Sequence, residues 1–132
     1  MSTIRFRGID HVQLAAPPGC EPAARAFFAD LLGLEEIAKP DALSSRGGCW
    51  FAIGAQQLHV GVTRSFRAER KGHPAFRLAS REELEALARL LEDAGVPLTR
   101  PSPGEIPGVA RFFAEDPWGS RLEFLADHDG AS

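Results

Sequence analysis

The stretch Gly8-Ile9-Asp10-His11-Val12-Gln13-Leu14 decides the fold, because it recurs in altered form as Gly72-His73-Pro74-Ala75-Phe76-Arg77-Leu78. His73 follows His11 by 62 positions. The same step carries further residues onto similar ones: Asp30 to Glu92, Gly33 to Gly95, Leu34 to Val96, and Trp50-Phe51-Ala52 to Phe112-Phe113-Ala114. A step of 64, which allows for the turn Pro117-Trp118-Gly119, carries Leu58-His59-Val60 to Leu122-Glu123-Phe124. The chain therefore contains two copies of one supersecondary unit.

Each copy is predicted to be a strand, a helix and then three strands, which is an α+β order of elements. In the first copy, Phe6–Ala15 alternates as a strand does, and a helix runs from about Glu21 to Gly33. Three short strands follow, near Leu34–Ile37, Gly48–Ile53 and Gln57–Val62. The second copy is predicted to contain a strand near His73–Leu78, a helix from the capping box of Ser80 and Glu83 to Gly95, and strands near Ala110–Ala114 and Arg121–Leu125.

The 132 residues are predicted to form one domain of two modules, at about residues 4–63 and 71–126. A basic linker at about residues 64–71 carries Arg64, Arg67, Arg70 and Lys71, and is most often only solvated. Residues 101–108 are rich in proline and glycine, and we expect a loop there that could cover a site. The tail, residues 127–132, is expected to fray.

Composition excludes several classes of protein. A formal net charge of -3 without a basic block argues against a nucleic-acid surface. The first residues lack the apolar core of a signal peptide and no run approaches membrane-spanning length, so we expect a cytoplasmic protein. Cys20 and Cys49 are interpreted as small apolar thiols, because two cysteines are too few for a disulfide framework. His128 in the tail is given no ligand role.

One face of the predicted sheets gathers polar side chains. Strand alternation places apolar residues toward the helices and the following residues on the opposite face: His11, Gln13, His59, His73, Arg77, Arg121 and Glu123. Each copy offers one ligand candidate from its first strand and one from its last. Imidazole nitrogens and one carboxylate oxygen suit a divalent transition metal, so His11, His59, His73 and Glu123 are candidate metal ligands. The alternative is a polar-lined cavity that binds a ligand without a metal.

The chain resembles the vicinal oxygen chelate superfamily, which is also called the glyoxalase/bleomycin resistance/dioxygenase superfamily. The matching features are Ile9-Asp10-His11-Val12, Phe27-Phe28 before Leu32-Gly33-Leu34, Gly72-His73-Pro74-Ala75-Phe76, and Asp116-Pro117-Trp118-Gly119 followed by Arg121-Leu122-Glu123. The resemblance covers about residues 7–126. It implies two paired βαβββ modules in a U-shaped, half-open barrel around a divalent metal, and a homodimer. His11, His73 and Glu123 fall on the family's two-histidine, one-glutamate metal set.

His59 falls on a fourth position that is a metal-bound glutamate in bacterial glyoxalase I. That enzyme needs a carboxylate there to move a proton, so glyoxalase I proper does not fit. Thiol-transferase fosfomycin resistance shares the pattern of His11, His73 and Glu123. The present chain, however, has no tyrosine and little sequence after Glu123 to contact that substrate.

The favoured hypothesis is a metal-dependent enzyme acting on a small substrate with vicinal oxygens. The metal (Fe, Mn, Ni, Co or Zn) would act as a Lewis acid in lyase or isomerase chemistry, or would activate dioxygen as in an extradiol-type dioxygenase. His59 and Glu123 are the candidate catalytic groups. The candidate substrate-pocket residues are Gln13, Trp50, Arg77, Phe112 and Arg121. The rival hypothesis is a metal-free protein that sequesters a ligand, as bleomycin resistance proteins do, and the least favoured is a degenerate structural module. The sequence leaves open whether the site lies within one chain or across two.

Overall fold

The structure is a computed structural model that describes residues 3–128. The chain divides between Phe66 and Arg67 into two compact units, and this division falls inside the predicted linker. Unit 1 precedes the division and unit 2 follows it. No helix within residues 3–128 is long and apolar enough to cross a membrane.

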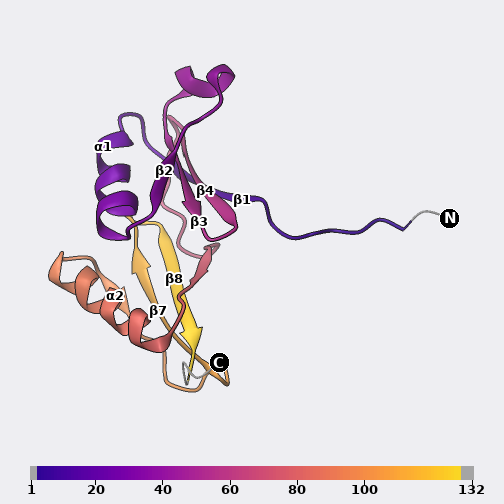
Figure 1. The fold of residues 1–132 in the computed structure, drawn as a ribbon. Helices are drawn as coiled ribbons and strands as arrows, with labels where there is room; N and C mark the ends of the chain where they lie inside the picture. Colours follow the sequence, from indigo (N-terminus) through magenta and orange to yellow (C-terminus); the bar gives the residue numbers. More distant parts are fainter. Residues whose placement is uncertain (1–2, 129–132) are drawn as a thin grey trace. The chain divides into compact units, whose positions relative to one another are not determined.

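Unit 1 is a four-stranded sheet with a helix on one face (Figure 1). Its elements are β1 (His11–Ala16), α1 (Glu21–Ala24), η1 (Arg25–Leu31), β2 (Glu35–Ile37), η2 (Asp41–Arg46), β3 (Cys49–Ile53) and β4 (Gln56–Val62). The strand order is β1-β4-β3-β2. β1 runs parallel to β4, whereas β3 is antiparallel to both β4 and β2. The helix begins at Glu21, as predicted, with Pro22 in the first turn, where its missing N–H costs little.

The core of unit 1 lies between its helix and its sheet. Phe28 is fully buried, and its ring lies 4.9 Å from that of Phe27 and 5.6 Å from that of Phe51. Leu58 and Val60 of the central strand β4 are buried on the same side. Because strand side chains alternate, this packing turns His59, between them, to the other face.

Unit 2 repeats the topology of unit 1. Its elements are β5 (Ala75–Arg77), α2 (Arg81–Asp93), β6 (Leu98–Thr99), β7 (Val109–Glu115) and β8 (Arg121–Asp127), and the strand order is β5-β8-β7-β6. β5 is parallel to β8, and the other neighbours are antiparallel. Leu84, Ala88 and Leu91 of α2 are buried, as are Leu122 and Phe124 of β8. The predicted repeat and the α+β fold are confirmed as two βαβββ units.

The predicted capping box begins α2. The Ser80 hydroxyl accepts a hydrogen bond from the Glu83 N–H at 3.1 Å and donates one to the Glu83 carboxylate at 3.1 Å. Gly95 follows the helix at φ 80°, the left-handed conformation that glycine adopts without strain. Both predicted ends of this helix are therefore accurate.

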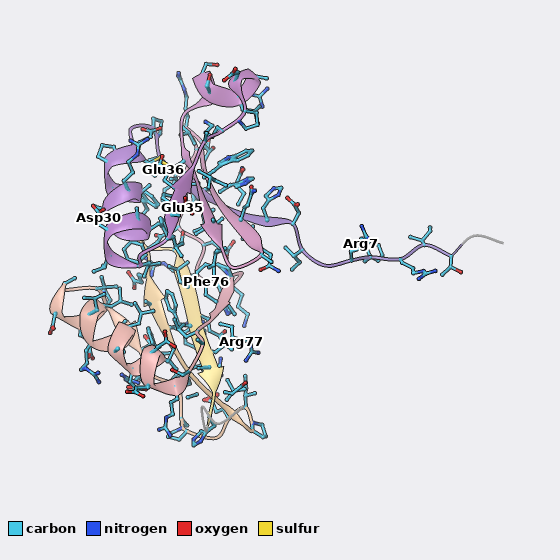
Figure 2. All side chains as sticks on the ribbon, in the orientation of Figure 1. Arg7, Asp30, Glu35, Glu36, Phe76 and Arg77 are labelled. Atoms are coloured by element: carbon cyan, nitrogen blue, oxygen red, sulfur yellow. The ribbon has the colours of Figure 1, made fainter. Side chains whose placement is uncertain are left out.

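Several predicted boundaries were wrong. The first strand begins only at His11. Residues 3–10 instead form an arm outside the sheet, with Phe6 94% exposed and Arg7 projecting from it (Figures 1 and 2). β6 and η2 were not predicted, because two paired residues and a 3-10 turn leave too short a pattern. β8 continues to Asp127, which pairs with Val109, so the tail begins later than predicted; residues 129–132 lie outside the described part.

The linker is not simply solvated. The Glu69 N–H donates to the Ser120 hydroxyl at 3.0 Å, and the Glu69 carbonyl accepts from the Arg121 N–H at 2.8 Å. The Glu69 carboxylate also accepts from the N–H groups of Lys71 and Gly72. The second half of the linker is therefore built onto the turn before β8.

Candidate metal centre and substrate-binding face

On the open face of unit 1, three rings form one stack. The His59 ring lies 3.8 Å from the Trp50 ring, with an angle of 2° between their planes. The His59 ring also lies 4.1 Å from the His11 ring, with an angle of 18° between their planes. The register explains the stack, because His59 sits on the central strand with Trp50 directly opposite it on β3. The three predicted residues are thus brought together and fixed in orientation.

Hydrogen bonds determine which nitrogen of each imidazole is free in unit 1. Nδ1 of His11 lies 3.0 Å from Oδ2 of Asp10, and a carboxylate only accepts, so Nδ1 carries the proton. Nε2 of neutral His11 then keeps its lone pair. Nε2 of His59 lies 2.9 Å from Oε1 of Gln57, which leaves the Nδ1 of His59 with a lone pair by the same argument.

His59 is held neutral. It is 5% exposed, and burial lowers its pKa; the neighbouring His11 lowers it further, while Asp10 opposes the shift. A neutral imidazole is the form that binds a metal or accepts a proton. Gln13, the β1 partner of His59, lies over Gly61, where a Cβ would stand 2.6 Å from the Gln13 amide nitrogen. Glycine at 61 therefore leaves room for the Gln13 side chain on the open face.

On the open face of unit 2, His73 meets Glu123. Nε2 of His73 lies 2.9 Å from Oε1 of Glu123, and Nδ1 of His73 lies 2.9 Å from the Lys71 carbonyl oxygen. A carbonyl cannot donate, so Nδ1 carries a proton and neutral His73 turns a lone pair toward Glu123. Two acceptors at 2.9 Å require a shared proton or a cation. The contact therefore fits a metal-binding pair.

Arg111 and Phe113 complete this part of unit 2, and sequence reasoning missed both. The Arg111 guanidinium lies 3.3 Å from Oε2 of Glu123 and 3.5 Å from Oε1 of Glu105, and also lies 5.2 Å from the Phe113 ring. The Phe113 ring contacts His73 edge to face, at 5.4 Å. Strand alternation from Glu123 through its partner Phe113 was the available signal, because Arg111 lies two residues before Phe113 on the same face.

The structure corrects the prediction for Phe112. It was predicted to line the pocket, but it is fully buried on the helix side, 5.3 Å from the Phe124 ring. The open face instead takes Phe113, since adjacent strand residues point to opposite sides. Arg77 is on the open face, as expected, and pairs with Asp127 at 2.8 Å; Figure 2 shows it beside Phe76, whose ring lies 5.5 Å from that of Phe124.

The four candidate ligands are thus distributed as two pairs. Unit 1 brings His11 and His59 together, and unit 2 brings His73 and Glu123 together. Among the described residues, no group of three or more His, Cys, Asp or Glu side chains is arranged to hold a metal ion. Each pair nevertheless has suitable donor chemistry, since each imidazole has one nitrogen occupied by an acceptor and the other left as a lone pair.

Residues 101–106 of the predicted loop line a hollow of about 380 Å³ in unit 2, together with Arg81, Val109 and Arg111. Arg100 also lines this hollow and forms a bidentate ion pair with Glu85. The loop therefore borders the same arginine that contacts Glu123.

Comparison with known proteins gives the family. The model of the Glyoxalase/Bleomycin resistance protein/Dioxygenase superfamily matches residues 8–124. The chain is 40% identical to a protein from Bacillus anthracis described as a glyoxalase family protein, with 96% of this chain and 99% of that chain covered and a TM-score of 0.87. No curated protein matches.

More distant structures share the fold. A lactoylglutathione lyase from Agrobacterium tumefaciens is 23% identical, with 92% of this chain and 94% of that chain covered and a TM-score of 0.68. A genomically encoded fosfomycin resistance protein from Listeria monocytogenes is 19% identical, with 93% of each chain covered and a TM-score of 0.77. The family match spans nearly the whole repeat, so the chain belongs to the glyoxalase/bleomycin resistance/dioxygenase superfamily, the vicinal oxygen chelate superfamily.

Proposed function

We propose that this protein is a metal-dependent enzyme acting on a small substrate with vicinal oxygens, and that His11, His59, His73 and Glu123 supply the ligands of a divalent ion. The observation that carries the proposal is the contact of His73 with Glu123. Their facing atoms both offer lone pairs at 2.9 Å while the other His73 nitrogen is committed to a carbonyl. The family, whose structures include a lactoylglutathione lyase, supports a lyase or isomerase; its name also admits a dioxygenase.

A bound Fe, Mn, Ni, Co or Zn ion would supply a Lewis acid for a chelating substrate, or an oxygen-activating centre in the case of iron. The chain's own groups prepare its ligands. Asp10 and the Lys71 carbonyl each accept from an Nδ1–H, which orients the imidazole and leaves Nε2 as a donor. Arg111 holds the second oxygen of Glu123, so the first stays directed at His73.

His59 is the proposed proton carrier. Its ring plane is fixed by stacking on Trp50 and His11, its Nε2 is held by Gln57, and burial keeps it neutral. A neutral imidazole with a free Nδ1 can accept a proton from a substrate carbon or oxygen and return it. Trp50 and Gln13 lie beside His59 on the open face of unit 1 and would orient the substrate. Glycine at 61 leaves the space that the Gln13 side chain occupies.

Elemental mass spectrometry of untagged protein tests the metal. About one divalent ion per chain is expected in the wild type and in His128→Ala, a histidine control outside the proposed set, and none in His11→Ala or Glu123→Gln. Iron would direct assays to dioxygenation, and nickel or zinc to lyase and isomerase reactions. No metal after anaerobic reconstitution with each ion would overturn the proposal. Light scattering on the same sample tests the homodimer that we propose.

A His59→Gln variant separates ligand from proton carrier. As a carrier, His59 can be replaced with retention of the metal but with a large loss of turnover and of the acidic limb of the pH–rate profile. As a ligand, its loss lowers metal content as His11→Ala does. Unchanged turnover and metal content would remove His59 from both roles.

A metal-free ligand-binding protein is the second candidate function. One observation favours it: a protonated His73 and Arg111 would each pair with one oxygen of Glu123, so both carboxylate oxygens have a partner without a metal. Equilibrium dialysis against small oxygenated anions, with and without chelator, would distinguish the two, since chelator-insensitive binding supports sequestration.

A further inference from the structure

A second hollow in unit 2, of about 180 Å³, lies beside the His73–Glu123 pair. Its lining includes Arg70, Pro97, Thr99, Phe113, Glu115 and Arg121. Phe113 connects the two places, because its ring touches His73 at 5.4 Å and lies 4.4 Å from the Arg121 guanidinium carbon. The hollow is therefore next to the proposed chemistry rather than remote from it.

Two arginines are held in this hollow by the backbone. Arg121 follows the turn that ends at Ser120, and its N–H donates to the Glu69 carbonyl. Arg70 follows Glu69 directly, so the same bonds that anchor Glu69 bring Arg70 to the turn. Gly119 has φ 89°, and a Cβ there would stand 3.7 Å from the Arg70 guanidinium. The anchored linker thus places the Arg70 guanidinium in the same hollow as Arg121.

The charges of these arginines are not neutralised by the fold. Arg77, Arg100 and Arg111 of unit 2 each form an ion pair with a carboxylate. Within residues 3–128, neither Arg70 nor Arg121 has a carboxylate within ion-pair distance. Glu115 is the single acidic group among the lining residues, so the hollow keeps one net positive charge. A planar guanidinium held over an aromatic ring suits a carboxylate or a phosphonate group.

We infer that the hollow formed by Arg70, Phe113 and Arg121 binds the anionic group of the substrate, a carboxylate or a phosphonate, with the apolar part of the substrate against Phe113 and Pro97. Arg121 and Glu123 lie two residues apart on one face of β8, so their Cα atoms are about 7 Å apart. That the bound anion is the substrate rests on the proposed function. The substrate class is then a compact anion that carries chelating oxygens in addition to its anionic group.

The test is a titration of 15N-labelled protein in EDTA, read from the backbone amides of Gly119 and Arg121. The probes are benzoate and phenylphosphonate, which distinguish the two anion classes, and neutral benzamide. Saturable shifts are expected with at least one anion, at least tenfold weaker binding in Arg70→Gln/Arg121→Gln, and less than twofold change in Arg89→Gln, an exposed arginine of α2. The single variants replace the double variant if its spectrum loses dispersion.

No saturation with either anion, equal affinity in the arginine variants, or equal binding of benzamide would overturn the inference. Because metal is absent from this titration, its outcome is independent of the metal assignment. Conversely, the arginine variants should retain the metal content of the wild type. If the His11 and Glu123 variants lose the metal but the titration fails, the proposed metal site is supported and only the proposed anion site is contradicted.

Discussion

Replacing Glu123 by Gln should separate the folding role of this residue from its metal role. In the metal-free protein a Gln amide N–H can donate to Nε2 of His73, and its oxygen can accept from Arg111, so both contacts at 2.9 Å and 3.3 Å are kept. The bond from the Arg111 guanidinium to a carboxylate becomes a bond to a neutral amide oxygen, and the contact with His73 loses its anionic partner, which costs about 1 kcal/mol each. Glu123 is only 8% exposed, so removing its charge relieves a desolvation cost of several kcal/mol that offsets this loss.

We therefore expect Glu123→Gln to lie within about 1 kcal/mol of the wild type, or about 4 °C in Tm for a chain of this size. Glu123→Leu is the matched control, since it removes both contacts with little change in volume. It leaves Nε2 of His73 without a partner and Arg111 with only the longer contact to Glu105. Leaving such groups unpaired costs about 2–4 kcal/mol, or roughly 10 °C.

Differential scanning fluorimetry with and without the ion identified by elemental analysis gives both results. An ion at 100 times its Kd should stabilise the wild type by about 2.7 kcal/mol and neither variant. Equal loss of stability in the Gln and Leu variants would refute the account of the hydrogen bonds. Equal stabilisation of the Gln variant by the ion would refute the assignment of Glu123 as a ligand.

Three further changes test the surrounding structure. Ser80→Ala removes the acceptor of the Glu83 N–H and should lower the free energy of unfolding by about 1 kcal/mol in urea titrations. The Gly48 N–H lowers the pKa of Glu21, so this carboxylate stabilises the fold above its unfolded pKa and that stability is lost as pH falls through the lower folded pKa. Glu21→Gln should therefore be less stable by about 1 kcal/mol at pH 7, with the difference vanishing toward pH 2 in thermal melts. Burial raises the pKa of Cys49 to about 11, so at pH 8 its thiol should react with a disulfide reagent only after denaturation; fast reaction of the native protein would contradict this burial.

The sequence predicted the longer elements and missed the shortest ones. The helix from Ser80 to Gly95 was accurate because its cap, its apolar stripe and its terminal glycine are all local signals. β6 is two residues long and is defined only by pairing with β7, so no local pattern marks it. The prediction that the first strand begins at Phe6 was wrong because a local pattern is present without a pairing partner. Its alternation is present, but nothing in unit 1 pairs with residues before His11 except the Asp10 carbonyl, which accepts from Gln57.

Among site residues, the sequence predicted which side chains share a face but not which of two neighbours faces it. Phe112 and Phe113 are chemically identical, and only the register that sets Phe113 opposite Glu123 decides between them. The repeat predicted that His73 and Glu123, fifty residues apart, share a face, and the structure brings them into contact. Arg111 did not, because its counterpart in the first copy is Cys49 and the repeat carries no charge at that position.

That difference between the copies bears on the charge of the substrate. The first copy contributes neutral imidazoles, with His59 kept neutral by burial, while the second contributes the single carboxylate of the proposed ligand set. A divalent ion on these ligands would keep one positive charge after Glu123 is counted. Arg111, whose guanidinium shares that same carboxylate, leaves this excess unchanged, because its own charge is offset by Glu105. In a partly buried site an uncompensated charge is costly, so the group that completes the coordination should be anionic. The unpaired Arg121 beside Phe113 acts in the same direction. A neutral diol or diketone would leave this excess in place, whereas an anionic chelator removes it.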